Sequence, residues 1–443
     1  MIDKFADFLD RNLSMPMARL AEQRHLRAIR DGIVAALPLI IVGSFFLIIA
    51  FPPLPDSLPF VSYLKSNAAK ILLPYRMTFF IISIYSTFGI GYSLAKSYKL
   101  DELTGGILAT TTFLLTIVPK AIGALSPELL KIIEGNEALL NYYKSLPMGF
   151  QMPMSQLGGG SMFVAIIASI IGVEIYRFTD KMNFKIKMPE QVPTSVARSF
   201  EALTPCTFII LFMSIITYFL GFDWHGFIGK LVAPLVKAAD TLPSACILIF
   251  LITFFWSFGI HGASIVGSIA RPIWIQILDA NTASYSIGEK VTGIAAEPFY
   301  QWFIWIGGAG ATIGLAICLA FFAKSSYAKS LGKTTLVPAI FNINEPIIFG
   351  CPIVLNPILI IPFVLSPIVL AVVSWYAMSI GLVSKVIVTA PWTLPGPVGA
   401  YIATGGDWRA AVLNIVCIII SVIIYYPFFK MYDSKLLKEE LSE

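Results

Sequence analysis

The stretch IVAALPLIIVGSFFLIIAF, residues 33–51, decides the fold class because it contains no charged side chain. An α-helix needs about 20 apolar residues to cross the hydrocarbon layer of a bilayer. Charge-poor blocks of comparable character recur along the chain, at 71–94, 163–175, 206–220, 247–260, 303–322, 353–378 and 410–429. This repetition predicts an all-α polytopic membrane protein.

The composition agrees with this prediction. Of the 443 residues, 57% are hydrophobic and 13% are charged, whereas a soluble domain carries about 25% charged residues. The five cysteines lie in or beside apolar blocks and form no CxxC pair, which predicts no disulfide framework, no metal site and no cofactor. The net charge of +5 comes from loop residues, so it indicates membrane topology and not nucleic-acid binding.

The basic residues predict the orientation. Residues Met1–Leu13 separate apolar and polar side chains onto two faces, as in a helix lying on a membrane surface. Four arginines then precede the first span, and basic residues cluster again near 96–99, 177–198, 324–333 and 430–438. Such clusters mark cytoplasmic loops. We therefore expect both termini in the cytoplasm.

An even number of crossings must separate two cytoplasmic clusters, and this requirement fixes the span count. Three clear blocks lie between the clusters at 177–198 and 324–333, so the Gly- and Ser-interrupted stretch 262–278 must supply a fourth crossing. The expected spans lie near 33–51, 71–94, 102–119, 161–177, 204–222, 244–260, 262–278, 299–322, 353–379 and 409–429. The prediction is thus about ten transmembrane helices and an amphipathic N-terminal helix.

Two further segments, 336–352 and 387–404, are apolar but contain prolines and glycines that interrupt a helix. Such backbone persists at membrane depth only where it packs in protein or lines a wet cavity, and paired broken segments indicate a transporter's binding site. We expect both to be re-entrant hairpins. The predicted organisation is an amphipathic N-terminus (1–27), five spans forming a scaffold or dimerisation domain (28–222), a transport domain with both hairpins (223–430) and a cytoplasmic tail (431–443).

Glu345 is the sharpest candidate for a functional residue. It lies in FNINEP, residues 341–346, inside the first expected hairpin, and a charge at membrane depth costs about 2.5–3.5 kcal/mol. We expect the carboxylate to accept hydrogen bonds from solute hydroxyls or to act as a base. The alternative is a structural ion pair or a cap at the hairpin tip.

His261 is the second candidate, in WSFGIHG, residues 256–262, where a long apolar run meets a broken helix. Taken alone, it fits a hydrogen-bonded core residue equally well, and the glutamate in the same half favours a functional role. His225 lies in a more polar loop and His25 among basic residues, so structural and surface roles fit these two.

Two tryptophans indicate the type of solute. Trp256 and Trp392 lie beside the breaks and not at span ends, where interfacial tryptophans gather. An indole ring packs against the apolar face of a sugar, whereas amides and carboxylates bind its hydroxyls. We therefore predict a sugar site, although core packing explains each tryptophan equally well. The predicted site residues are Asn342, Asn344, Glu345, His261, Trp256 and Trp392.

The motifs resemble a known family. NINEP at 342–346 resembles the Asn/Thr-x-Glu-Pro signature of enzyme IIC, the membrane component of the sugar phosphotransferase system. WSFGIHG at 256–262 resembles the histidine motif of its lactose/cellobiose/diacetylchitobiose branch, and RHLRAIRDG at 24–32 and GGAGAT at 307–312 fit the same branch. The resemblance covers essentially the whole chain.

The resemblance implies a homodimer in the bacterial inner membrane that imports a β-linked disaccharide, diacetylchitobiose or cellobiose rather than lactose. It also implies that the sugar is phosphorylated on a 6-hydroxyl by the phosphocysteine of a separate enzyme IIB protein, so the chain would carry the sugar site but not the phosphocysteine. Glu345 and His261 would lie near the accepting hydroxyl, in roles that the sequence does not separate. The alternatives are a proton-coupled secondary sugar transporter and a membrane scaffold or sensor.

Overall fold

Helices make up nearly all of the regular structure in the computed structural model, which describes residues 23–52, 57–146, 148–184, 186, 188–189, 192–259, 261–351, 353–354 and 356–442. Within these residues, the strands β1 (Lys120–Ile122) and β2 (Gly149–Gln151) form one antiparallel pair. The all-α class is therefore confirmed. The expected surface helix at Met1–Leu13 lies outside the described residues.

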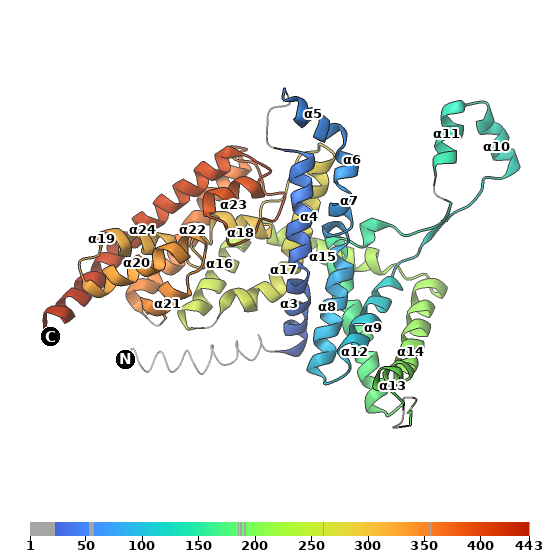
Figure 1. Cartoon of the computed structure of the whole chain (residues 1–443), viewed down its shortest axis with the longest axis horizontal. Helices are drawn as coiled ribbons and strands as arrows, with labels where there is room; N and C mark the ends of the chain where they lie inside the picture. The colour runs from blue at the N-terminus through green and yellow to red at the C-terminus, as the bar shows by residue number, and fades with distance from the viewer. Residues whose placement is uncertain are drawn as a thin grey trace.

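The N-terminal half combines long helices with many short ones. Its helices are α3 (Arg24–Ala35), α4 (Leu37–Ala50), α5 (Pro59–Ser66), α6 (Ala68–Ile71), α7 (Leu73–Arg76), η2 (Phe79–Ile81), α8 (Ile82–Ser97), α9 (Glu102–Leu114), α10 (Pro127–Glu134), α11 (Glu137–Ser145), η3 (Met154–Gln156), η4 (Gly159–Ser161), α12 (Met162–Lys181), α13 (Thr194–Glu201), α14 (Leu203–Ser214) and η5 (Ile215–Phe219). In Figure 1, α10 and α11 stand away from the other helices.

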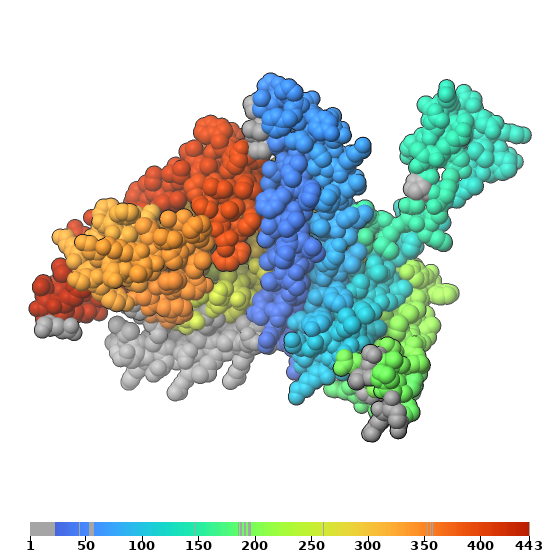
Figure 2. Space-filling view, in the orientation of Figure 1, coloured from blue at the N-terminus to red at the C-terminus, as the bar shows by residue number. Residues whose placement is uncertain are grey.

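The C-terminal half begins with a sharply bent helix pair and contains the broken segments. Its helices are α15 (Trp224–Ala239), α16 (Leu242–Ser257), α17 (Gly262–Ser286), α18 (Glu297–Phe303), α19 (Ile313–Phe322), α20 (Ser326–Ile340), α21 (Glu345–Gly350), α22 (Pro357–Ser379), α23 (Gly396–Ala403) and α24 (Trp408–Ser442). Helices α18 to α24 gather on one side of α3 and α4, and α9, α12 and α14 lie on the other (Figures 1 and 2).

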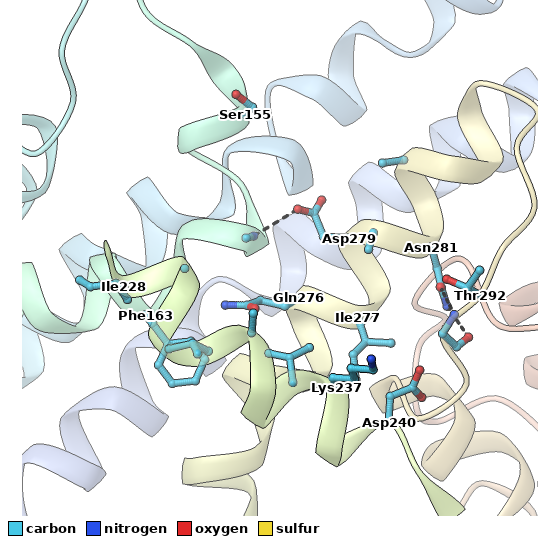
Figure 3. A pocket seen from close by; sticks show the side chains of 18 of the residues that line it. Ser155, Phe163, Ile228, Lys237, Asp240, Gln276, Ile277, Asp279, Asn281 and Thr292 are labelled. Carbon is cyan, nitrogen blue, oxygen red and sulfur yellow. Dashed lines mark hydrogen bonds between the residues drawn. The ribbon is translucent and has the colours of Figure 1, made fainter. Parts of the chain in front are cut away.

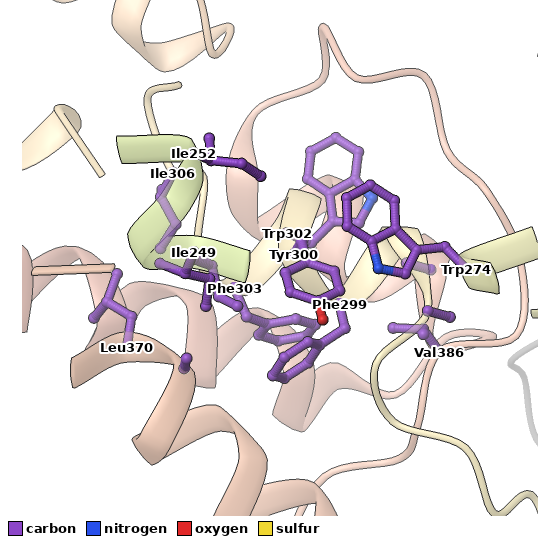
Figure 4. Close-up of a cluster of buried hydrophobic side chains, with 14 of the residues drawn as sticks. Ile249, Ile252, Trp274, Phe299, Tyr300, Trp302, Phe303, Ile306, Leu370 and Val386 are labelled. Carbon is purple, nitrogen blue, oxygen red and sulfur yellow. The ribbon is translucent and has the colours of Figure 1, made fainter. Parts of the chain in front are cut away.

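Large aromatic side chains fill the centre of this second half (Figure 4). Trp302 and Phe303 of α18 are almost completely buried, and the rings of Trp274 and Tyr300 lie 4.8 Å apart between α17 and α18. Such side chains contribute large apolar areas to a core. These aromatic side chains fix α18 against α16, α17 and α22. The broken segments described below therefore lie against closely packed helices.

Helices occupy all ten expected span positions, but not all of them are simple spans. Six helices of the described residues are long and apolar enough to cross a membrane, and a seventh results if α15 and α16, bent by 81°, count as one span. The expected crossing at 299–322 is not one continuous helix, because α18 ends at Phe303 and α19 begins at Ile313. Gly307, Gly308 and Gly310 adopt positive φ angles of 78°, 96° and 83°, which no α-helix contains, and the chain therefore unwinds between α18 and α19.

Both expected hairpins reverse the direction of the chain near their prolines. In the first, α20 turns into α21 at 341–344, with Asn342 at a φ of 61°. In the second, a non-helical segment leads into α23, and the Ile387 N–H donates to the Ala403 carbonyl at 2.8 Å. The depth of both hairpins in the membrane and the domain boundaries stay predictions.

Candidate functional site

The WSFGIHG motif forms the reversal between α16 and α17. Gly259 adopts a φ of 78°, and His261 then caps the start of α17, its Nδ1 accepting from the Ser264 N–H at 3.2 Å. The rings of Trp256 and His261 lie 4.6 Å apart. Trp256 is 6% exposed, and its indole N–H has no hydrogen-bond partner within the described part of the chain. The helix start and the indole thus fix the position of the imidazole.

Asn342 joins three broken segments. Its Oδ1 accepts from the Gly307 N–H at 2.9 Å, and its Nδ2 donates to the carbonyls of Trp392 at 2.8 Å and Leu394 at 3.1 Å. These bonds hold the turn between α20 and α21, the break between α18 and α19, and the second hairpin together. The Asn342 amide makes these three bonds within the protein, and its expected contact with sugar stays a prediction.

Asn344, two residues after Asn342, has a similar role. Its Nδ2 donates to the Ala309 carbonyl at 2.8 Å, and its side chain packs so closely on Gly308 that a Cβ there would clash with it. Helix α24 supports the same break, because Ser421 Oγ donates to the Ala311 carbonyl and Tyr425 Oη to the Gly310 carbonyl. Broken backbone at membrane depth needs such partners.

Glu345 and His261 lie at two of these turns, within electrostatic range of each other. Glu345 is the first residue of α21, and its side chain is exposed, as is that of His261. Both the Glu345 carboxylate and the Arg30 guanidinium of α3 lie close enough to act electrostatically on His261. The sequence placed both candidates in the second half but treated Arg30 only as a topological marker. Their exposure shows that they face open space rather than the core.

The two tryptophans differ. Trp392 is 52% exposed, and it contributes its carbonyl to Asn342 while its ring stays free of the core. Trp256 is buried beside His261, which agrees with a packing role as much as with a solute contact. His225 is structural, as predicted, because its ring nitrogens bind Thr116 at 3.1 Å and Ser161 at 3.0 Å.

Sequence reasoning missed three charged residues in the second half. Arg271 Nη2 and Glu297 Oε1 form an ion pair of 3.0 Å between α17 and α18, with side chains only 19% and 26% exposed. Asp279 of α17 accepts from the Gly160 N–H at 3.3 Å. A single charge in an apolar stretch is the signal that would have found them.

Asp279 also lines a cavity of about 550 Å³ between α12, α15 and α17 (Figure 3). The GGG run at 158–160 packs there against α17, and a Cβ at Gly159 would lie 3.0 Å from that of Asp279. Close packing therefore explains Gly158 and Gly159. This cavity contains neither Glu345 nor His261, so the converging motif turns, and not this cavity, define the candidate site.

Broken helices that bring a carboxylate and an imidazole together in a helical membrane protein define a solute transporter. The chain matches the family described as "Phosphotransferase system, EIIC" over residues 30–367, and it belongs to that family. It is 38% identical to the lichenan permease IIC component of Bacillus subtilis, over 96% of this chain and 93% of that protein. It is 37% identical to the cellobiose-specific EIIC component of Geobacillus stearothermophilus, over 100% and 97%.

A solved structure shares the whole fold. The transporter ChbC, the IIC component from the N,N'-diacetylchitobiose-specific phosphotransferase system, matches with a TM-score of 0.88 and 37% identity, over 98% of this chain and 100% of that chain. Lactose-specific EIICB components also match, for example that of Lacticaseibacillus casei at 30% identity over 96% of this chain and 70% of that protein.

Proposed function

We propose that this phosphotransferase-system permease takes a β-linked disaccharide, cellobiose or diacetylchitobiose, as its substrate and releases it inside as the 6-phosphate. The observation that carries the proposal is the placement of Glu345 and His261 at two motif turns, within electrostatic range of each other. Similar proteins are named for lichenan, cellobiose, oligo-β-mannosides and diacetylchitobiose, and β-linked sugars are common to these names.

The exposed side chains supply the contacts that such a sugar needs. Glu345 accepts hydrogen bonds from hydroxyl groups, and the exposed Trp392 ring offers an apolar face for a pyranose. The indole N–H of Trp256, which has no hydrogen-bond partner among the described residues, is a further donor beside His261. Asn342 and Asn344 shape the site by holding the turns. Recognition of a sugar by a few placed polar groups on a largely preformed site is the usual pattern.

Phosphoryl transfer follows from this placement. The sugar 6-oxygen attacks the phosphorus of the phosphocysteine, the new O–P bond forms, the S–P bond breaks, and the cysteine leaves as a thiolate. Glu345 or His261 takes the hydroxyl proton. Such transfer depends mainly on positioning and charge stabilisation, and the Arg30 guanidinium near His261 places positive charge where the incoming phosphoryl group is negative.

The donor and the assembly belong to the same proposal. The phosphocysteine is carried by an enzyme IIB protein that docks on the cytoplasmic side, and two copies of the chain form a homodimer. Both termini lie in the cytoplasm, since the basic residues at the start of α3 and at the end of α24 lie outside the apolar spans.

The variant Glu345→Gln tests the site. We expect it to lose sugar phosphorylation by phosphorylated IIB while sugar binding survives at least in part, because the amide keeps the size of the side chain but is no base. Glu137→Gln, on the outlying α11, is the matched control and should retain full turnover. Full turnover in Glu345→Gln would contradict the role assigned to Glu345.

A binding panel tests the substrate. Thermal-shift titrations with cellobiose, diacetylchitobiose and lactose should show stabilisation by the first or second sugar at lower concentration than by lactose. Stronger stabilisation by lactose would contradict the proposed specificity.

A further inference from the structure

Two adjoining cavities lie where α3 and α8 meet at the end of the first span. One, of about 530 Å³, is lined only by polar and aromatic-hydroxyl side chains. The other, of about 700 Å³, runs between the exposed sides of α3 and α8. They share Arg24 and Ser97, so they form one continuous depression, which we call the α3–α8 groove.

The polar end of the α3–α8 groove is positively charged. Two guanidinium groups pack on the Tyr98 ring, with the Arg24 Cζ 4.7 Å and the Arg177 Cζ 4.1 Å from its centroid. Within the described part of the chain, Glu174 is the carboxylate that Arg177, at 3.0 Å, and His25, at 3.2 Å, share there. Two guanidinium groups thus face one carboxylate, which leaves excess positive charge beside a cavity large enough for a phosphate group.

The groove becomes apolar along α3 and α8. Beyond Arg24, the groove is lined by Arg27, Lys96 and the carboxylate Asp31. Its far end is lined by Ala35 and Phe88. Phe88 is 37% exposed, so this end opens to the surroundings. Helices α3 and α8 lie side by side along its length (Figures 1 and 2).

We propose that the α3–α8 groove binds an anionic phospholipid of the cytoplasmic leaflet, with the phosphate at Arg24 and Arg177 and an acyl chain along Ala35 and Phe88. The change from basic to apolar lining follows the change from headgroup to hydrocarbon in a bilayer. Basic pockets between spans on the cytoplasmic side suit anionic headgroups, and positive residues mark that side. The proposal is independent of the sugar assignment.

Charge complementarity favours a lipid over a second copy of the chain. A two-fold interface brings the same surface of both copies together. An interface centred on this groove would therefore bury the basic residues Arg24, Arg27 and Lys96 of both copies, and an excess of like charge within one interface is unfavourable. An anionic lipid meets the same arginines with opposite charge.

The test compares lipids and charges. Purified full-length protein is incubated with phosphatidylglycerol or phosphatidylcholine of equal acyl composition, and retained lipid is counted by native mass spectrometry. We expect retention of phosphatidylglycerol to fall about 30-fold in Arg24→Gln/Arg177→Gln, given the usual contribution of a basic residue to anionic-lipid binding. Lys131→Gln/Lys144→Gln, on the outlying α10 and α11, is the matched control and should retain the lipid fully.

A second variant tests the acyl part. Ala35→Trp fills the apolar end without changing charge and should also reduce phosphatidylglycerol retention, and unchanged sugar binding in both variants shows that the fold is intact. Equal retention in wild type and the arginine variant would overturn the proposal. So would competition by inorganic phosphate at the same concentration as the lipid, or conversion of a dimer to a monomer by the arginine variant.

Discussion

Replacing Asn342 with alanine should release the turn that carries Glu345. Three hydrogen bonds are lost, to the Gly307 N–H and to the carbonyls of Trp392 and Leu394. Asn342 is 8% exposed, so little water is available to replace them. The φ of 61° adds a further cost for alanine, because a Cβ is disfavoured in the left-handed region.

The size of the effect follows from these terms. Three hydrogen bonds contribute about 3 kcal/mol at a net 1 kcal/mol each, and the left-handed conformation adds about 1 kcal/mol for alanine. The free energy of unfolding should therefore fall by about 4 kcal/mol in Asn342→Ala. Asn342→Gly loses the same bonds without the conformational cost, so it should lose about 1 kcal/mol less.

Equilibrium unfolding in mixed micelles measures these differences, and sugar affinity measured on the folded fraction should fall in both variants. Asn141→Ala, an exposed position on α11, is the control and should change neither quantity. Wild-type stability together with wild-type affinity in Asn342→Ala would refute the reasoning that this side chain holds the three broken segments together.

Three further predictions concern the surroundings of the site. Gly308→Ala should destabilise the fold by about 1–3 kcal/mol, the usual cost of a residue other than glycine in such a conformation, as measured by the same unfolding assay; an unchanged midpoint would contradict it. Arg271→Gln leaves a half-buried carboxylate unpaired and should cost about 1–3 kcal/mol, whereas Arg271→Gln/Glu297→Gln should recover part of the loss; no recovery would show that the pair is not coupled. Partial burial opposes ionisation of Asp407, but hydrogen bonds from Arg409 and Ser384 hold the pKa of its carboxyl below the ordinary 3.8. The ionised Asp407 carboxylate therefore stabilises the fold above that value, and this stabilisation disappears as the pH falls through the lower pKa of the folded protein. The difference in stability between wild type and Asp407→Asn should shrink over the same range, and a difference that grows on acidification would contradict the assignment.

The spans were predictable because charge-poor length is a property of the sequence alone. The parity of basic clusters also located α17, which begins at Gly262 as expected but continues to Ser286. The break at Gly307–Gly310 was not predicted, because glycines also favour close helix packing and the sequence does not show which glycines adopt positive φ.

The site was predicted in part. The motif turns identified Glu345 and His261, and the structure places them within electrostatic range of each other, whereas their roles stay predictions. The role of Asn342 depends on partners at 307 and 392–394, which lie far from it in the sequence, so no local pattern reveals it. Arg30 escaped notice for a related reason, since a basic residue before a first span is explained by topology alone.

The chemical form of the imported sugar tests the central claim most directly. Proteoliposomes containing the protein, with phosphorylated IIB enclosed, are supplied with labelled cellobiose or diacetylchitobiose outside, and the internal label is separated into free and phosphorylated sugar. We predict that the label appears inside as the 6-phosphate, only with phosphorylated IIB present, and that Glu345→Gln abolishes it. Free sugar accumulating inside in response to a proton or sodium gradient, without phosphodonor, would contradict the account.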